Sequence, residues 1–142
     1  MVKEVIKSNE NKGGAQSMAK MVEKVKKAKG KKEFLQFEVY LLKLDPTVGA
    51  EINKKRPCLI VSNSIANEGF ETVWILPITS KVHNFPTRIP FLNDKEEKNY
   101  IAVDQLRVVD KGRLSKYLYT ITDSEVIDEV YEKINLMLYR KK

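Results

Sequence analysis

Short apolar runs separated by turn residues fill the chain from Phe37 to Ile121. Runs of roughly 4–8 residues that are rich in β-branched and aromatic side chains are typical of strands. Their close spacing favours a small barrel over alternating strands and helices. The pattern predicts six strands, at residues 37–44, 57–63, 71–78, 87–91, 100–103 and 117–121, with a charged turn at 94–99.

One long amphipathic helix is predicted to close the chain. Thr122 and Glu125 have the spacing of a capping box, so we expect Thr122 to cap the helix. The cations at 140–142 suit its C-terminal end. Its apolar stripe consists of Val126, Val130, Ile134, Met137 and Leu138. Strands followed by one packed helix predict a mostly β fold over residues 37–142.

Residues 1–36 form a basic, polar extension that we expect to be flexible or partly helical. Within it, residues 18–29 can form a helix with an apolar stripe of Met18, Met21, Val22 and Val25. One interpretation is a basic helix that touches RNA or a membrane. The other is a solvated extension, and the composition favours it because Gly30 and a polar stretch separate the helix from the body.

The formal net charge of +7 invites a nucleic-acid hypothesis, but most of it lies outside the predicted domain. Residues 1–36 carry ten lysines against four glutamates, so six of the seven net charges belong to the extension. The body is nearly neutral, and bulk charge says little about what it binds. The case for RNA must therefore rest on a site.

The cysteine count and the length of the apolar runs indicate the cellular compartment of the protein. Cys58 is the only cysteine, which excludes an intrachain disulfide and a cysteine-based zinc site. No apolar run approaches the roughly 20 residues needed to span a bilayer, and residues 1–36 lack the apolar centre of a signal peptide. We expect a cytoplasmic protein with no membrane partner.

Several catalytic classes are excluded by composition. His83 is the only histidine and lies in a predicted loop, so a two-histidine ribonuclease is impossible. Neither GxxxxGK[ST] nor GxGxxG occurs, which argues against nucleotide-binding folds. The acidic residues are scattered, so we expect no two-metal site and no cofactor. Cys58, among apolar neighbours, is expected to be a buried structural thiol.

Three segments carry candidate chemistry. Arg56 stands directly before Pro57, where the backbone is held extended, and its guanidinium offers forked donors to a phosphate. A structural ion pair is the alternative. Thr79, Ser80 and Lys81 end a strand with two hydroxyls and a cation, which suits a phosphate or a plain turn cap. Asp104 and Gln105 interrupt an apolar strand pattern with polar side chains.

The ordered motifs DPTVGAEINKKRPCLIVSN, ILPITSK, PTRIPF and VDQLRVVDKGRL resemble the MazF/PemK family of toxin–antitoxin ribonucleases across residues 39–138. The resemblance implies an SH3-like β-barrel with a C-terminal helix, a homodimer, cleavage of single-stranded RNA at short sequences, and inhibition by a cognate antitoxin. Two departures stand out. Some members carry an arginine where this chain has Ala102, and the usual RG[DE] entry to the first strand is replaced by Gln36, Phe37 and Glu38.

The resemblance also implies roles for individual residues. Arg56 matches the main catalytic arginine, and Thr79 the threonine that positions the scissile phosphate. Glu51 and Asp104 match acidic positions with acid, base or supporting roles. The residues to which we assign RNA contacts are Asn53, Lys54, Ser80, Lys81 and Gln105.

RNA carries its own nucleophile, the 2′-hydroxyl, so we expect metal-independent cleavage that leaves a 2′,3′-cyclic phosphate and a 5′-hydroxyl. Two alternatives stay open. One is an RNA-binding barrel without catalysis, and the other is a toxin of the gyrase-poison type; loss of Arg56 or Thr79 would favour either, and both residues are present.

Overall fold

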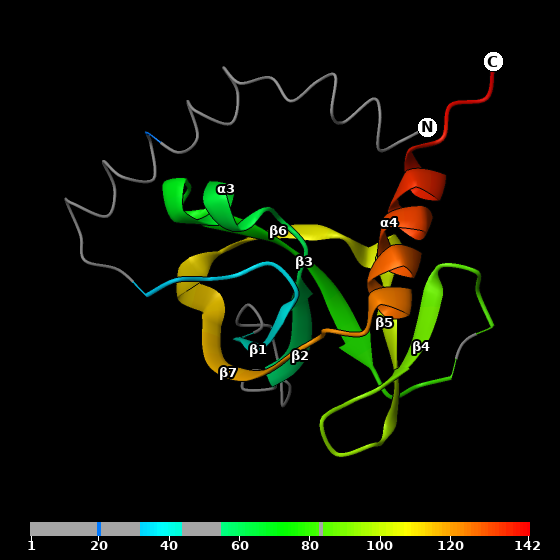
Figure 1. Ribbon diagram of the computed structural model, residues 1–142, viewed down its shortest axis with the longest axis horizontal. Helices are drawn as coiled ribbons and strands as arrows, with labels where there is room; N and C mark the ends of the chain where they lie inside the picture. The colour runs from blue at the N-terminus through cyan, green and yellow to red at the C-terminus, as the bar shows by residue number, and fades with distance from the viewer. Residues whose placement is uncertain (1–19, 21–31, 44–54, 83) are drawn as a thin grey trace, which may run out of the picture.

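The computed structural model describes residues 20, 32–43, 55–82 and 84–142. Two helices lie in these ranges, α3 (Ser64–Gly69) and α4 (Ser124–Leu138), with two 3-10 turns, η1 (Val103–Gln105) and η2 (Lys111–Arg113). The rest is mostly sheet (Figure 1). Its strands are β1 (Glu38–Lys43), β2 (Lys55–Ile60), β3 (Thr72–Thr79), β4 (Arg88–Leu92), β5 (Lys98–Ala102), β6 (Arg107–Asp110) and β7 (Leu114–Thr120).

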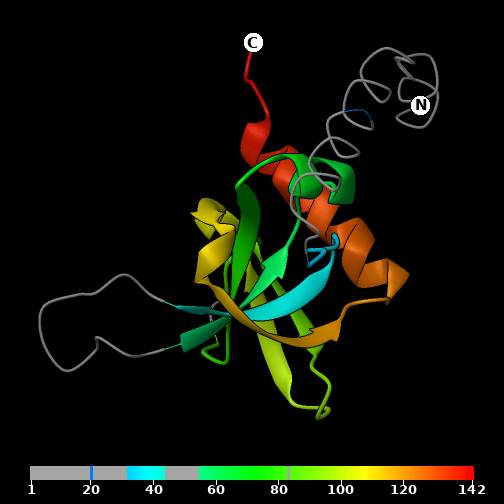
Figure 2. The same ribbon diagram turned by 90° about the vertical axis from the view of Figure 1, so that its left-hand side faces the viewer.

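All strand pairs are antiparallel, in the order β4-β5-β3-β2-β1-β7, with β6 also paired to β3. The predicted mostly β fold with a C-terminal helix is confirmed. In the described residues the edge strands β4 and β7 do not pair, so the SH3-like sheet curves without closing into a barrel (Figure 2). The helix α4 packs beside this open edge, where Val130 shares one cluster with Ile89 of β4 and Ile121 after β7.

Apolar side chains bury both faces of the central strands. On β2, Leu59 belongs to the cluster under α4, whereas Cys58 and Ile60 belong to the cluster on the opposite face. Successive side chains of a strand point to opposite faces, so a continuous apolar run is buried on both sides. The strand expected at residues 57–63 is present but lies earlier, at Lys55–Ile60, and its Cys58, Leu59 and Ile60 are fully buried.

Two elements were not anticipated from the sequence. β6 was missed because its four residues follow the polar interruption at Asp104 and Gln105, which hides the alternation. α3 was missed because six residues are too few to show a helical period. Its start is nonetheless encoded locally, since the side chain of Asn63 accepts hydrogen bonds from the backbone of Ile65 and Ala66.

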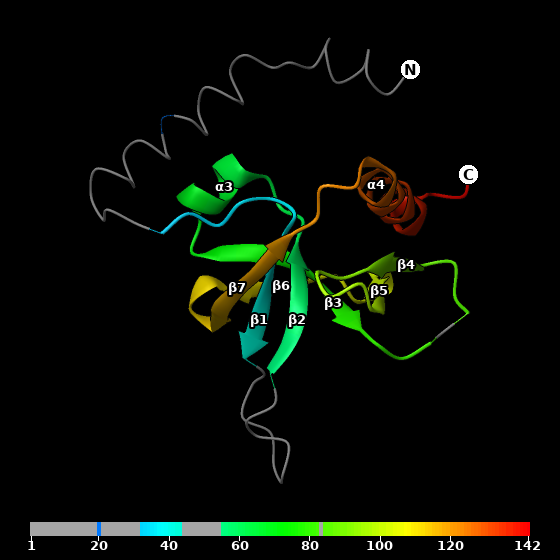
Figure 3. The same ribbon diagram turned by 60° about the horizontal axis from the view of Figure 1, so that its bottom comes forward.

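The closing helix is present, with two corrections. Asp123 caps it in place of Thr122, because the Asp123 carboxylate accepts a hydrogen bond from the Glu125 N–H at 2.9 Å. The apolar stripe is also shorter than expected. Val130 is 1% exposed, whereas Leu138 is 74% exposed, since the C-terminal part of α4 runs past the strands (Figure 1). Figure 3 looks nearly along the helix, which lies over β4 and β5. No helix in the described ranges is long and apolar enough to cross a membrane.

The entry to the sheet is fixed by side chains. The Gln36 amide donates to the Val61 carbonyl at 2.8 Å, and its backbone N–H donates to the Ser64 hydroxyl at 2.8 Å. The next residue, Phe37, has a φ of 70°, a conformation that is rare for a bulky residue, and its backbone bonds to Ile60 and Ile121. Of the helix expected at 18–29, only Lys20 is described, and it is helical; the remainder lies outside the described residues.

Candidate active site

One face of the sheet changes from apolar to polar toward the end where β2 begins and β3 finishes. Cys58 and Ile75 contribute to the core cluster on this face. Because side chains alternate, Arg56 lies on the same face as Cys58, and Thr79 lies on the same face as Ile75. The face that buries apolar side chains in its middle therefore presents a guanidinium and a hydroxyl at its end.

The strands that carry these two groups are neighbours in the sheet. The register between β2 and β3 runs from Ile60 opposite Ile75 to Cys58 opposite Pro77. Arg56 and Thr79 each lie two residues beyond the last of these pairs, and both line one cavity. Neighbouring strands thus supply both predicted catalytic groups to the same cavity.

A cavity of about 390 Å³ opens at this point. Its apolar wall is formed by Leu42, Pro57, Cys58, Pro77, Ile78 and Ala102. Its polar groups are Arg56, Thr79, Lys81, Arg88, Gln105 and Arg107. Four of these six are cations, so the cavity suits an anionic ligand with an apolar portion. A phosphate joined to a nucleoside has that character.

The hydroxyl of Thr79 has a structural role that does not use its proton. Its oxygen accepts a hydrogen bond from the Lys81 N–H at 3.1 Å, which caps the turn after β3. The hydroxyl proton is still available to be donated toward the cavity, because a hydroxyl is both donor and acceptor. The predicted turn cap and the predicted phosphate contact are therefore compatible.

Asp104 is held by an ion pair with Arg88. Its carboxylate accepts from Arg88 Nε at 2.8 Å and from Nη2 at 3.1 Å, and also from the Thr87 hydroxyl at 3.0 Å. The hydrogen bonds from Arg88 hold the pKa of Asp104 below its ordinary value, although partial burial opposes them. A carboxylate with a lowered pKa is a weak proton acceptor at neutral pH, so its surroundings favour orienting Arg88 over acid–base work.

Cys58 lines the cavity without being a nucleophile. It is fully buried, and burial raises the pKa of its thiol to about 12, against smaller opposing effects of a Tyr40 backbone hydrogen bond and of the Arg107 charge. The thiol therefore stays protonated at neutral pH. Within the described ranges, no three His, Cys, Asp or Glu side chains gather closely enough to hold a metal ion.

Of the predicted site residues, the cavity brings together Arg56, Thr79, Lys81 and Gln105, with Asp104 behind Arg88. Ser80 is exposed and does not line it. The other predicted residues, Glu51, Asn53 and Lys54, lie outside the described residues, as does His83.

Sequence reasoning missed two cavity residues, Arg88 and Arg107. Both lie inside the motifs PTRIPF and DQLRVVD, but in the sequence an arginine within a strand cannot be distinguished from an ordinary solvent-exposed residue. Only their positions in the chain could have identified them. Arg88 directly follows Thr87, and Arg107 begins a strand two residues after Gln105, so both lie where strands enter the site.

Residues 35–138 match a family model described as PemK-like, MazF-like toxin of type II toxin-antitoxin system. The chain is similar to Endoribonuclease EndoA of Bacillus subtilis, with 31% identity over 106 residues that cover 71% of this chain and 90% of the relative. It is also similar to Endoribonuclease MazF of Staphylococcus epidermidis, with 32% identity over 98 residues that cover 64% and 80% of the two chains.

Solved structures share the fold at lower identity. MazF of Deinococcus radiodurans aligns with a TM-score of 0.64 and 21% identity, covering 76% of this chain and 98% of that one. A MazE–MazF complex from the same organism gives a TM-score of 0.67 at 21% identity, covering 76% and 97%. A mycobacterial endoribonuclease in complex with its cognate antitoxin gives 0.62 at 23% identity, covering 74% and 94%.

Proposed function

The chain belongs to the PemK-like, MazF-like toxins of type II toxin–antitoxin systems, and from this premise we propose a specific reaction for its cavity. Its curated relatives are endoribonucleases that it matches over most of their length, so the protein is an endoribonuclease toxin. We propose that it cleaves single-stranded RNA, with mRNA in the cytoplasm as substrate, at short sequences and without a metal ion.

The proposed reaction uses the nucleophile that RNA carries. The 2′-oxygen attacks the adjacent phosphorus, and the bond from phosphorus to the 5′-oxygen breaks. The 2′-hydroxyl proton passes to a base, the departing 5′-oxygen gains a proton, and the products are a 2′,3′-cyclic phosphate and a 5′-hydroxyl. Catalysis then requires alignment and fixed donors for the charge that develops on the phosphoryl oxygens.

The presence of Arg56 and Thr79, from neighbouring strands, in one cavity that also holds three further cations carries this proposal. Arg56 donates to the phosphoryl oxygens with a group that stays charged at any physiological pH. Thr79 adds a hydroxyl donor whose position is fixed by the Lys81 N–H. We assign RNA contacts to Lys81 and Gln105 because both line the cavity, and we retain Glu51 as the proposed proton acceptor.

The decisive experiment incubates the purified full chain with a long single-stranded RNA in EDTA and maps the new ends. Cuts at one short sequence, with cyclic phosphate at the 3′ side and hydroxyl at the 5′ side, would support the proposal. Binding without cleavage would favour the RNA-binding alternative. Strict dependence on magnesium would replace the metal-independent reaction with a metal-assisted one.

We further propose that an antitoxin protein inhibits this chain. The solved MazE–MazF complex and the mycobacterial toxin with its cognate antitoxin share its fold. A cavity whose charged lining residues are all cations would accept an acidic antitoxin segment in competition with RNA. The two ligands would then exclude each other.

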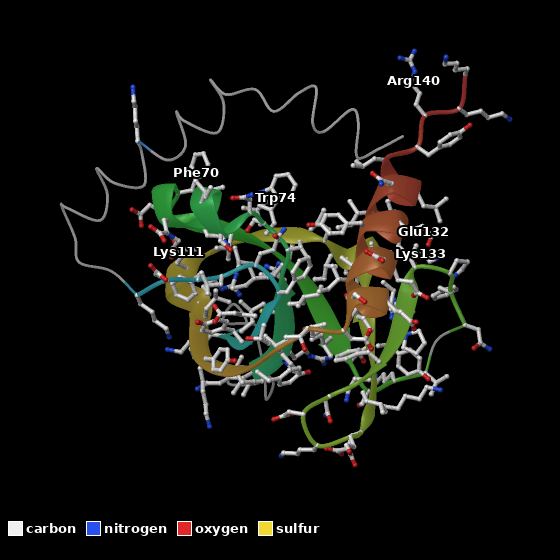
Figure 4. All side chains as sticks on the ribbon, in the orientation of Figure 1. Phe70, Trp74, Lys111, Glu132, Lys133 and Arg140 are labelled. Carbon is white, nitrogen blue, oxygen red and sulfur yellow. The ribbon has the colours of Figure 1, made fainter. Side chains whose placement is uncertain are left out.

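An exposed apolar surface supports the proposal of a homodimer. Trp74 and Val108 are cross-strand neighbours on β3 and β6, and they are 53% and 55% exposed. Phe70, 52% exposed, directly follows α3 and stands four residues before Trp74 in the chain; both are labelled in Figure 4. Such patches on soluble proteins mark interaction sites, and aromatic residues are enriched at the centres of interfaces.

We expect Trp74→Glu to shift the protein from dimer to monomer in sedimentation velocity, because a charge would be buried at the interface. Lys116→Glu, an exposed position on β7, is the matched control and should leave the dimer intact. A wild-type protein that sediments as a monomer at micromolar concentration would refute the homodimer.

A further inference from the structure

The pairing of Arg88 with Asp104 leaves part of the guanidinium available to a ligand. Asp104 contacts one edge of the group, formed by Nε and Nη2. An arginine has five N–H donors, so two protons on Nη1 and one on Nη2 lie outside this ion pair. The side chain is 8% exposed and lines the cavity that holds Arg56 and Thr79.

Strand geometry directs Arg88 toward that cavity. Arg88 is paired with Ala102 across β4 and β5, one position along from the pair of Ile89 with Ile101. Ile89 and Ile101 belong to the core under α4, so Arg88 and Ala102 face the other way. Ala102 also lines the cavity, and its small side chain leaves room for the guanidinium of its neighbour.

The guanidinium is restrained on two sides before any ligand binds. The Asp104 carboxylate fixes its edge, and that carboxylate is itself held by the Thr87 hydroxyl at 3.0 Å. The ring of Phe85 lies 5.8 Å from the guanidinium carbon, within the range of a cation–π contact. A donor that is already oriented loses little freedom on binding, which raises its value in a transition state.

We propose that Arg88 is a second phosphate-binding residue of the active site, acting with Arg56 on the scissile phosphate, and that Asp104 is its positioning residue. The inference rests on the proposed ribonuclease function and deepens it. Arg56 reaches the phosphate from β2, and Arg88 reaches it from β4. Two guanidinium groups from different strands would stabilise the charge on both non-bridging oxygens.

Two other interpretations make different predictions for the same residues. If the pair is only a clamp between β4 and η1, its loss should lower stability and leave the cleavage rate unchanged below the melting temperature. If Asp104 is instead the proton acceptor, its removal should slow cleavage whether or not Arg88 is present. A double-mutant cycle separates a residue that acts through another from one that acts independently.

The experiment compares Arg88→Gln, Asp104→Asn and the double variant in single-turnover cleavage of a fluorescent RNA that contains the mapped site. Rate and half-saturation are measured across pH 5–8 and below each variant's melting temperature. Arg140→Gln, in the segment that follows α4 (Figure 4), controls for the loss of one positive charge. Arg88→Lys tests whether a charge without the fork is sufficient.

We expect Arg88→Gln to lower the saturated rate about 10²-fold, the scale for loss of one transition-state donor. Asp104→Asn should lower it roughly tenfold, the scale for groups that only orient an active residue. The double variant should be no slower than Arg88→Gln, and Arg88→Lys should recover only part of the rate. The pH profile of Asp104→Asn should keep the wild-type shape.

Three results would overturn the inference. An Arg88→Gln variant with the wild-type saturated rate would show that the pair is a clamp. A double variant slower than Arg88→Gln, or a pH profile altered by Asp104→Asn alone, would assign acid–base work to Asp104. The inference fails and the proposed function stands if wild-type protein and Arg88→Gln cleave RNA equally fast and Arg56→Ala does not cleave it. The proposed function itself fails if wild-type protein does not cleave RNA.

Discussion

At the scale of single residues, the charge of Arg56 is the feature with the largest expected effect on activity. Its side chain is exposed, so truncation removes no core packing. We expect Arg56→Ala to lower the single-turnover cleavage rate by about 10²–10³-fold with an unchanged melting temperature. Arg56→Lys should also be slow, because an ammonium cannot donate in a bidentate manner.

Lys55→Ala is the matched control for Arg56, since the neighbouring cation on β2 is exposed and does not line the cavity. It should cleave near the wild-type rate. A folded Arg56→Ala variant with the same rate as Lys55→Ala would remove Arg56 from the mechanism. Circular dichroism melts of both variants establish that the comparison is made between folded proteins.

Thr79 is expected to affect both stability and rate, because one hydroxyl serves the turn and the site. Thr79→Val keeps the branched shape but leaves the Lys81 N–H without its acceptor. We expect a loss of about 0.5–1.5 kcal/mol in the free energy of unfolding and a lower cleavage rate. Thr79→Ser retains the hydroxyl and should stay near wild type; a Thr79→Val variant that is less stable but equally fast would mean that the residue is a turn cap alone.

The site residues that were predicted from the sequence have an unusual local context, whereas Arg88, which was missed, does not. Arg56 precedes a proline and Thr79 ends an apolar run, so each is unusual in its local context. Arg88 is unusual only through its partner, because Asp104 lies 16 residues further along the chain. Local patterns do not specify such pairs, which become visible once β4, β5 and η1 are placed in space.

At the scale of elements, short runs of apolar, β-branched and aromatic residues were sufficient to predict the longer strands, whereas the pairing of the strands was not predictable. Along one edge, β3 pairs with two different strands. Thr72 to Ile75 pair with β6, and Ile78 and Thr79 pair with β5. The close spacing of short strands favoured a small barrel. Whether the edge strands of such a sheet meet is not encoded in any one strand, and here β4 and β7 do not pair.

The first turn of α4 provides a test of the corrected cap. Asp123→Ala removes the acceptor for the Glu125 N–H and should cost about 1 kcal/mol in the free energy of unfolding. Thr122→Ala, one residue earlier, should cost no more than about 0.5 kcal/mol, as is usual for a surface position. Urea denaturation of the two variants in parallel measures the difference, and a larger loss for Thr122→Ala would restore the capping-box prediction.

At the scale of the whole molecule, charge is divided between a basic extension and a nearly neutral body, in which the cavity around Arg56 and Thr79 is lined by cations. Residues 1–31 hold nine lysines and three glutamates. We expect their deletion to weaken RNA affinity and to flatten its salt dependence, since each phosphate contact contributes about 0.7 to the logarithmic slope on single strands. The cleaved sequence should not change, because base contacts specify it.

The deletion should end before Lys32, because Phe34 belongs to the buried core and Gln36 anchors the entry to β1. A full-length variant with Lys24, Lys26, Lys27 and Lys29 changed to glutamine keeps the length and tests charge alone. Binding at two salt concentrations and a melting curve are measured for both proteins.

If both proteins lose affinity and salt dependence while their melting temperatures hold, the extension attracts RNA by charge. If only the deletion lowers the melting temperature, the apolar stripe that includes Met18 and Val22 packs on the body or on a second subunit. Unchanged affinity at low salt, where screening is weakest, would make the extension a solvated segment without a role in binding. A new cleavage sequence after deletion would contradict the division between an extension that attracts RNA and a cavity that selects its site.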